Sequence, residues 1–423
     1  MKKKMMMIFC VLTMLCLLTG CTQGTMSQLE SLFSNSEKKE TVIQTGSSDE
    51  QGDTVTIPRA EYEQYRRFSD VLDIYNAASQ YFYIEPDYDK MVEYAARGLM
   101  AGLDDPYSFY YSPEEFQKML EDDTGNYVGI GVMISANYNT QQCTIIRVFD
   151  GSPAEESGVH RGDILYRVGD DLYVTPDTLD EAVSVMRGQE GTTVEVTFIR
   201  NGEEITKTIE RRGVSVNQVN SKMLDGQIGY IAYYEFAGQS DKEFENALNE
   251  LEKQQLKALI IDLRDNRGGW VEHARYIADL FLDAGELCYL VYRDGEEVHT
   301  EYQTKDGKVE IPIVILMNEY SASASEILAG ALRDRANAKI VGVTSFGKGI
   351  IQVVLNVGDK GAGYQMTVAQ YFTPNGYAVH KNGIVPDLEV PLEEGDNGMY
   401  EFADIQNDPQ LKKAYETALE LIK

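Results

Sequence analysis

The stretch NEYSASASE, residues 318–326, joins the apolar segment IPIVILM at residues 311–317 to a segment with helical spacing over residues 322–335. A short apolar run followed by turn residues is typical of a buried strand. Small residues at a helix start let another segment approach closely. The stretch therefore predicts a strand, a turn and a helix, which is the repeating unit of an α/β fold.

The same alternation continues on both sides of this stretch. Strands are expected at residues 227–235, 257–263, 311–317 and 339–343, and helices at 241–253, 271–282 and 322–335. Two more strands are expected at 350–356 and 364–372. The pattern predicts a mixed α/β core over residues 213–395, closed by a helix within residues 396–423.

Residues 60–212 have a different pattern. Residues 60–124 have helical periodicity, and Ser112 with Glu115 has the spacing of a capping box. Residues 125–212 are rich in strands, with a helix expected at 176–187 and a tight hairpin at the Asn-Gly pair 201–202. A helical segment and a compact β-rich module are therefore expected before the core.

The N-terminus has the features of an export signal. Lysines 2–4 precede an apolar run at residues 5–18 that is too short for a comfortable membrane span. The sequence LTGC at 18–21 resembles a bacterial lipobox, which predicts a lipoprotein signal peptide over residues 1–20 and lipid on Cys21. The alternative is an ordinary secretory signal with an incidental cysteine. Residues 21–59 are expected to form a flexible tether, so the chain is expected to be extracytoplasmic and lipid-anchored to the bacterial cell membrane.

The composition excludes several classes of protein. The chain has 423 residues, 43% of them hydrophobic, a net charge of −30 and a pI near 4.5. Such a chain is not wholly disordered, and it lacks the clustered Lys and Arg that a nucleic-acid binder needs. No metal and no cofactor are expected, because the sequence has neither an H-E-x-x-H motif nor paired cysteine spacing. Cys143 and Cys288 are expected to be buried free thiols, with a single disulfide as the alternative.

Two familiar catalytic arrangements fit poorly. Residues 342–349, GVTSFGKG, match a phosphate-binding loop until Gly349, where a magnesium-binding Ser or Thr is required. A strand is expected after this loop, whereas a phosphate-binding loop precedes a helix. None of the four histidines has a triad context, and the sequence has no G-x-S-x-G elbow. Nucleotide binding and Ser-His-Asp hydrolysis are therefore disfavoured.

A Ser-Lys pair is the remaining arrangement. A serine at a helix start lies near free amides and the positive end of the helix dipole, which favour an oxyanion. Lys348 can act as a general base when it is neutral, and the amide of Gln352, four residues on, can orient its amine. On residue types alone a simpler interpretation is favoured: the serines cap a helix and Lys348 is a solvated loop residue.

Several motifs then occur in the order of one known family. They are LDDPYS at 103–108, SPEEF at 112–116, YVGIGV at 127–132, GSPA at 151–154, GVHRGD at 158–163, SASE at 323–326 with Lys348 and Gln352, YFTPNG at 371–376 and GIVPD at 383–387. Through these motifs residues 60–392 resemble the carboxyl-terminal processing peptidases, also called tail-specific proteases. The resemblance implies a PDZ domain over residues 125–212 and a crotonase/Clp-like α/β protease core over 213–395.

The resemblance also implies roles for single residues. Ser323 would be the nucleophile, Lys348 the general base and Gln352 the residue that orients Lys348. The amides of Ala324 and Gly269 would form the oxyanion hole, with Gly268 as the alternative donor. The peptide carboxylate would bind at Gly129, Ile130, Gly131 and Val132. Arg187 is a candidate relay that gates the active site, and Ser321, Ser325 and Glu326 would be supporting residues. Trp270 departs from the family pattern.

The implied function is that of a serine endopeptidase that recognises free apolar C-terminal tails through its PDZ domain and cleaves protein substrates. The alternative is a catalytically silent lipoprotein that binds tails as an adaptor; the intact Ser323, Lys348 and Gln352 argue against it. The expected partners are proteins or peptides with free C-termini and the membrane, with no nucleic acid. Relatives also imply a homodimer through residues 60–85 and 396–423.

Overall fold

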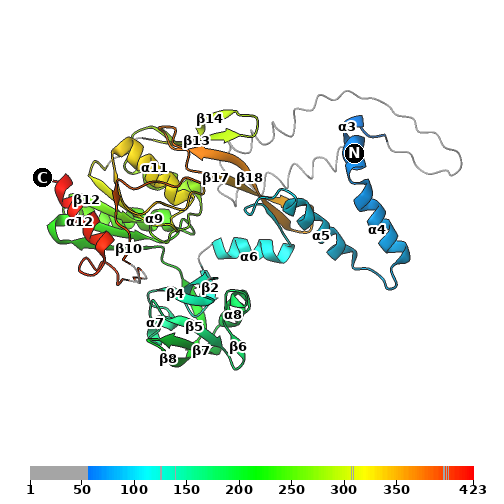
Figure 1. Ribbon diagram of the computed structural model, residues 1–423, viewed down its shortest axis with the longest axis horizontal. Helices are drawn as coiled ribbons and strands as arrows, with labels where there is room; N and C mark the ends of the chain where they lie inside the picture. The colour runs from blue at the N-terminus through cyan, green and yellow to red at the C-terminus, as the bar shows by residue number, and fades with distance from the viewer. Residues whose placement is uncertain are drawn as a thin grey trace. The chain divides into compact units, whose positions relative to one another are not determined.

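The computed structural model describes residues 56–123, 126–138, 140–305, 307, 309–393, 396, 398 and 400–423. The predicted signal peptide, Cys21 and nearly all of the predicted tether lie outside the described residues. The chain forms two compact units, the first ending at Tyr110 and the second running from Tyr111 to Lys423 (Figure 1). No helix in the described part is long and apolar enough to cross a membrane.

The first unit is helical, as its periodicity predicted. It contains α3 (Arg59–Arg67), α4 (Ser69–Tyr81) and α5 (Tyr88–Ala101), and the short strand β1 (Phe109–Tyr111) follows. None of these three helices contains a buried residue, and Tyr81 and Tyr83 are 80% and 85% exposed. The unit therefore leaves much of its apolar surface uncovered.

The second unit begins with α6 (Pro113–Asp123) and a β-rich module. The predicted capping box is present, because Ser112 N donates to Glu115 Oε2 at 2.7 Å and Glu115 N donates to Ser112 Oγ at 3.2 Å. The elements of the module are β2 (Asn126–Gly129), β3 (Val132–Asn137), β4 (Gln142–Val148), α7 (Pro153–Glu156), β5 (Ile164–Val168), β6 (Leu172–Tyr173), α8 (Leu179–Met186), β7 (Thr193–Arg200), β8 (Glu203–Glu210) and β9 (Arg212–Ser215).

The module has its own core. Its main sheet has the order β3-β4-β5-β7-β8 with β6 on β5, while β2 pairs with β9. The hairpin predicted at residues 201–202 is confirmed by the pairing of Arg200 with Glu203. Helix α8 starts later than residue 176, where the sequence predicted it, because Thr178 Oγ1 accepts from Thr175 N and donates to Tyr173 O in a turn.

A parallel sheet forms the centre of the following region. Its strands, in spatial order, are β10 (Val219–Leu224), β11 (Ile228–Tyr233), β12 (Ala258–Asp262), β15 (Ile313–Met317), β16 (Lys339–Gly342) and β19 (Leu388–Glu389). The one-turn helix η1 (Asp225–Gln227) joins β10 to β11, which pair antiparallel, whereas the other described pairs of this sheet are parallel. Strands β11, β12 and β15 are buried on both faces, which explains why they read as continuous apolar runs.

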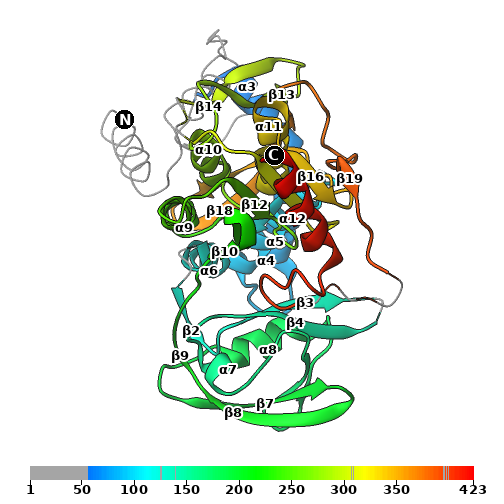
Figure 2. The same ribbon diagram turned by 90° about the vertical axis from the view of Figure 1, so that its left-hand side faces the viewer.

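Alternate residues of each strand face two different cores. In β12, Leu259 and Ile261 pack in one cluster with residues of α9 (Ser240–Glu252), α10 (Val271–Asp279) and α11 (Ala324–Ala336). Ala258 and Ile260 pack in the other with residues of α12 (Pro409–Leu421), the helix predicted to close the chain. Figure 2 shows α12 beside β12 and β16.

A second, antiparallel sheet completes this region. It contains β13 (Gly285–Tyr292), β14 (Glu297–Thr304), β17 (Ile350–Val357) and β18 (Ala362–Phe372), with β18 between β17 and β13. Strands β17 and β18 were predicted, whereas the β13–β14 hairpin was not. Two register shifts interrupt that hairpin, and polar residues on β14 hide the period of the strand.

Candidate active site

Three loops carry the residues that the sequence singled out, and each follows a strand of the parallel sheet. Residues 263–270 follow β12, residues 318–323 follow β15 and residues 343–349 follow β16. These strands are neighbours and run parallel, so their carboxyl ends lie at one edge of the sheet. The topology therefore gathers segments that are far apart in the sequence.

Glu326 connects two of these loops. It is fully buried in the first turn of α11, and its Oε2 accepts from Ser323 N at 2.8 Å and from Lys348 N at 2.9 Å. Its Oε1 accepts from Ser345 Oγ at 2.5 Å and from Gly347 N at 2.7 Å. The predicted nucleophile and the predicted base thus donate their backbone amides to one carboxylate oxygen.

Burial raises the pKa of Glu326, and the four hydrogen bonds act in the opposite direction. All four donors are neutral N–H or O–H groups, so they favour the ionised carboxylate without forming an ion pair. Glu326 was expected to be a supporting residue. The structure agrees and adds that its partners lie on two loops.

Ser323 immediately precedes α11 and is 8% exposed. The helix begins at Ala324, two residues later than predicted, because Ser323 has φ 58° and ψ −116°, which no α-helical residue adopts. The other two serines of the stretch donate hydrogen bonds to the loop after β12. Ser321 Oγ donates to Leu263 O at 2.7 Å, and Ser325 Oγ donates to Asn266 O at 2.9 Å.

Lys348 lies half-buried between two close-packed glycines. A Cβ on Gly349 would overlap the backbone of His380, and one on Gly347 would lie 2.9 Å from Gly383 N. Gln352 follows on β17, where its Nε2 donates to Thr367 Oγ1 at 3.2 Å. The loop that holds Lys348 therefore has a defined backbone course beside Ser323.

The two candidate oxyanion glycines differ in their hydrogen bonds. Gly268 N donates to Asn266 Oδ1 at 2.9 Å, so this amide is already used. Among the residues that the structure describes, no acceptor is recorded for the amides of Gly269 and Ala324. A Cβ on Gly268 would lie 2.9 Å from Ala324 N, which shows how closely the two loops approach.

Asn266 is a buried residue of the loop after β12 that was not among the predicted site residues. It is fully buried, and its Nδ2 donates to Tyr233 O at 2.7 Å while its Oδ1 accepts from Gly268 N. Its position between Asp265 and the glycine pair was the available signal. Trp270, which departs from the family pattern, is 37% exposed at the end of this loop.

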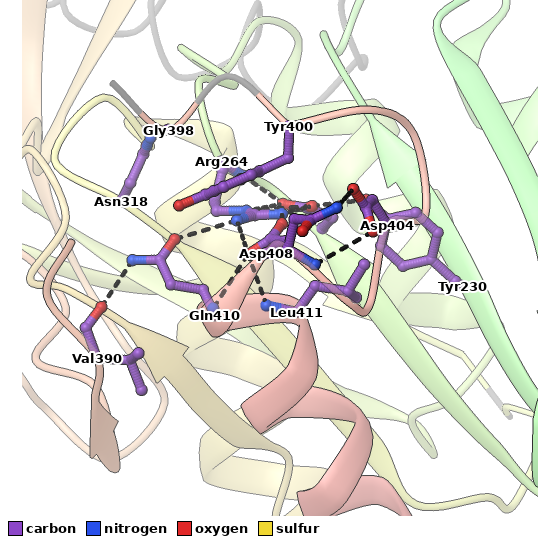
Figure 3. Close-up of polar contacts among 12 residues, drawn as sticks. Tyr230, Arg264, Asn318, Val390, Gly398, Tyr400, Asp404, Asp408, Gln410 and Leu411 are labelled. Atoms are coloured by element: carbon purple, nitrogen blue, oxygen red, sulfur yellow. Dashed lines mark hydrogen bonds and ion pairs between the residues drawn. The ribbon is translucent and has the colours of Figure 1, made fainter. Parts of the chain in front are cut away.

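A buried ionic cluster ties α12 to the end of β12 (Figure 3). Arg264 Nη2 lies 2.6 Å from Asp262 Oδ2 and 2.7 Å from Asp408 Oδ2, and Arg264 Nη1 donates to Gln410 Oε1 at 3.1 Å. Tyr230 OH donates to Asp262 Oδ2 at 2.8 Å. Burial alone would raise the pKa of Asp262, but the charge and hydrogen bonds of Arg264 outweigh it and hold that pKa below its ordinary value.

The predicted carboxylate-binding residues lie between β2 and β3. Gly129 ends β2 and Val132 begins β3, while the carbonyls of Ile130 and Gly131 accept from Ala154 N at 2.8 Å and Phe149 N at 3.1 Å. No acceptor is recorded for the amides of Ile130 and Gly131 within the described ranges. Both residues are buried, and neither amide is committed to an acceptor within those ranges.

Arg187 follows α8, and its guanidinium lies 4.9 Å from the centre of the Tyr127 ring. Its Cγ would lie 3.7 Å from a Cβ on Gly129, so the side chain is close to the predicted carboxylate loop. Cys143 and Cys288 are both free and buried, which confirms the thiol interpretation and excludes a disulfide between them.

Comparisons with known proteins agree with this architecture. The profile of peptidase family S41 matches residues 227–390, and that of the PDZ domain matches residues 128–211. A carboxyl-terminal-processing protease of Synechocystis sp. is 36% identical over 78% of this chain and 76% of its own length. The carboxy-terminal processing protease CtpA of Bacillus subtilis is 34% identical over 78% of this chain and 70% of its own length.

A solved structure supports the same assignment. The photosystem II D1 C-terminal processing protease is 27% identical, with a TM-score of 0.52 over 76% of this chain and 92% of that protein. Fold, domain content and sequence identity thus agree. The chain belongs to the carboxyl-terminal processing proteases of peptidase family S41, with a PDZ domain, and is a serine-type peptidase.

Proposed function

We propose that the chain is a Ser-Lys endopeptidase in which Ser323 is the nucleophile, Lys348 the general base and Gln352 the residue that orients Lys348. The observation that carries the proposal is the Glu326 carboxylate, which accepts from the amides of both Ser323 and Lys348. The hydroxyls of Ser321 and Ser325 donate to backbone carbonyls instead, which favours Ser323 among the three serines.

The proposed reaction proceeds by acyl transfer. Neutral Lys348 removes the proton from Ser323 Oγ, which attacks the scissile carbonyl carbon. The resulting oxyanion accepts hydrogen bonds from the amides of Ala324 and Gly269. The Lys348 ammonium then protonates the leaving amine, and water hydrolyses the acyl-enzyme with Lys348 again accepting the proton. Gly269 is the better second donor because Gly268 N is occupied by Asn266.

Substrate selection is assigned to the PDZ domain. A free C-terminal carboxylate would accept from the loop at Gly129, Ile130, Gly131 and Val132, and the peptide would extend as an added strand. The unoccupied amides of Ile130 and Gly131 support this part of the proposal.

The direct test uses an unfolded protein with an apolar C-terminal tail. We expect the wild type to cleave it, Ser323→Ala to leave it intact, and an amidated tail to abolish cleavage. Cleavage that survives in Ser323→Ala contradicts the Ser-Lys proposal. Binding without cleavage by the wild type would instead favour the silent adaptor.

Arg187 is proposed as the relay between the tail site and the active site, because it lies close to Gly129 in the carboxylate loop. Arg187→Ala should therefore change the ratio of peptide-stimulated to basal cleavage. Unchanged basal and stimulated rates would remove Arg187 from the mechanism.

Two further proposals concern location and assembly. We expect Cys21 to carry lipid on the outer side of the cell membrane, so that Cys21→Ala moves the protein from the membrane fraction to the soluble fraction. We also expect a homodimer through residues 60–85 and 396–423. The uncovered apolar side chains of α3 and α4 support that interface, and sedimentation velocity measures the assembly.

A further inference from the structure

The backbone conformation of Ser323 requires support from its surroundings. Its φ of 58° with ψ of −116° lies outside the regions that a non-glycine residue readily occupies. Such a conformation is unfavourable for a non-glycine residue and persists only where neighbouring groups constrain it. The direction of the Ser323 side chain depends on this conformation, so whatever holds the backbone also aims the hydroxyl.

Most of the contacts to Ser323 come from its own helix. The carbonyl oxygen accepts from Glu326 N at 2.9 Å and from Ile327 N at 3.0 Å, and Ser323 N donates to the Glu326 carboxylate. The two bonds to the carbonyl oxygen are those that the residue before a helix ordinarily makes. They do not by themselves explain the positive φ.

A further hydrogen bond to the Ser323 carbonyl comes from the antiparallel sheet. Tyr371 OH, on β18, donates to the Ser323 carbonyl oxygen at 3.2 Å. Tyr371 is 1% exposed, and burial, followed by the charge of Glu326, raises the pKa of its hydroxyl well above the ordinary value. Both effects favour the neutral phenol, which is the form that donates a hydrogen bond.

The backbone of Tyr371 contacts the loop that holds Lys348. Tyr371 N donates to Gly349 O at 3.1 Å, next to Lys348. On the far side, Tyr371 pairs with Leu290 of β13, so it lies in the interior of the antiparallel sheet. A tyrosine side chain has two rotatable bonds to its rigid ring, and here it spans from the Lys348 loop to the Ser323 carbonyl.

We infer that Tyr371 is a positioning residue for the peptidase reaction, holding the Ser323 backbone in its strained conformation at a fixed distance from the Lys348 loop. This inference rests on the proposed Ser-Lys function. Without the phenol hydroxyl, the Ser323 carbonyl keeps its two helix bonds but loses its tie to the sheet. The backbone can then relax toward an ordinary helix start and move Oγ away from Lys348.

The test compares Tyr371→Phe with Tyr302→Phe. Tyr302 is buried in the same core cluster, on β14, so its variant removes a phenol hydroxyl from the same environment. We expect kcat to fall at least about tenfold in Tyr371→Phe, with KM changed by less than about twofold, because misplacing a nucleophile affects the chemical step. Tyr302→Phe should retain the wild-type kcat.

A second measurement does not depend on turnover. Hydrogen–deuterium exchange of a peptide covering residues 320–330 should be faster in Tyr371→Phe than in the wild type or in Tyr302→Phe. Wild-type kcat together with wild-type exchange in Tyr371→Phe would overturn the inference. A loss of thermal stability without a change in kcat would also overturn it, because that outcome indicates a structural role alone. Activity that survives in Ser323→Ala would contradict the proposed function instead. The exchange measurement would then still test whether Tyr371 holds the backbone at Ser323.

Discussion

Two buried carboxylates beside the carboxyl ends of the parallel strands have different partners. Asp262 faces the guanidinium of Arg264, which also binds Asp408 of the C-terminal segment. Glu326 faces four neutral donors from the loops that hold Ser323 and Lys348. The pKa of Asp262 is lowered by Arg264 against the effect of burial, whereas burial raises the pKa of Glu326.

The difference indicates two uses of buried charge. The Arg264 cluster joins elements of secondary structure, so its loss should affect unfolding. The Glu326 carboxylate fixes the relative position of two loops, so its loss should affect turnover.

The largest effect is expected from Arg264→Met, which leaves Asp262 and Asp408 buried together without a cation. Removing one partner of a buried ion pair costs about 3–5 kcal/mol. Urea unfolding should show this loss, with Arg275→Met as the control. Arg275 pairs with Glu272 in a partly exposed i,i+3 contact and should lose less than about 1 kcal/mol. Equal losses in the two variants would contradict the structural role of the cluster.

Glu326→Gln should affect catalysis next most strongly. One carboxylate oxygen becomes an NH2 group that faces donors, so two hydrogen bonds are lost in a buried site. We expect kcat to fall about 100-fold while the fold, monitored by circular dichroism, is retained. Glu319→Gln changes an exposed residue of the same turn and should be neutral. A Glu326→Gln enzyme with wild-type kcat would show that the shared carboxylate does not position the loops.

Ser345→Ala removes a single donor from Glu326. Ser345 Oγ also accepts from Ile384 N at 2.7 Å, so we expect a loss of about 1–2 kcal/mol in unfolding free energy. The bond from Ser345 lowers the pKa of Glu326, so activity in this variant should begin to fall at a higher pH on acidification. Ser157→Ala, which removes a hydroxyl bonded to Pro153 O in the PDZ domain, is the control. If the pH at which activity falls on acidification is unchanged in Ser345→Ala, protonation of Glu326 does not cause that fall.

The smallest effect is the dependence of stability on pH, and its sign differs between the two carboxylates. The pKa of Asp262 is lower in the folded state than in the unfolded state. Its contribution to the free energy of unfolding is therefore present above pH 3.8, its ordinary pKa, and is lost as the pH falls through the folded-state pKa. The pKa of Glu326 is higher in the folded state than in the unfolded state. Its contribution to the free energy of unfolding is therefore present below pH 4.5, its ordinary pKa, and is lost as the pH rises through the folded-state pKa.

Unfolding curves at several pH values measure this difference. On acidification, the stability difference between wild type and Asp262→Asn should shrink, and that between wild type and Glu326→Gln should grow. Parallel trends for the two variants would remove the distinction between the carboxylates.

The sequence predicted much of the fold because the relevant signals are local. The apolar runs that became β12 and β15, the capping box at Ser112 and the Asn-Gly hairpin each depend on residues within a few positions of one another. The β13–β14 hairpin was missed because bulges and polar residues interrupt its period. The start of α11 was placed two residues early because nothing local signals the positive φ of Ser323.

The family resemblance named Ser323, Lys348 and Gln352, but the sequence indicated only local support for them, such as Glu326 at the start of its own helix. By itself the sequence determined the order of strands and helices, the domain content and the candidate residues, because periodicity and motif spacing are properties of neighbouring positions. Only the tertiary structure decided that Glu326 joins two loops, that Asn266 occupies the amide of Gly268, and that Tyr371 reaches the Ser323 carbonyl. Those contacts depend on which strands are adjacent, and adjacency in a sheet is set by the packing of the whole core.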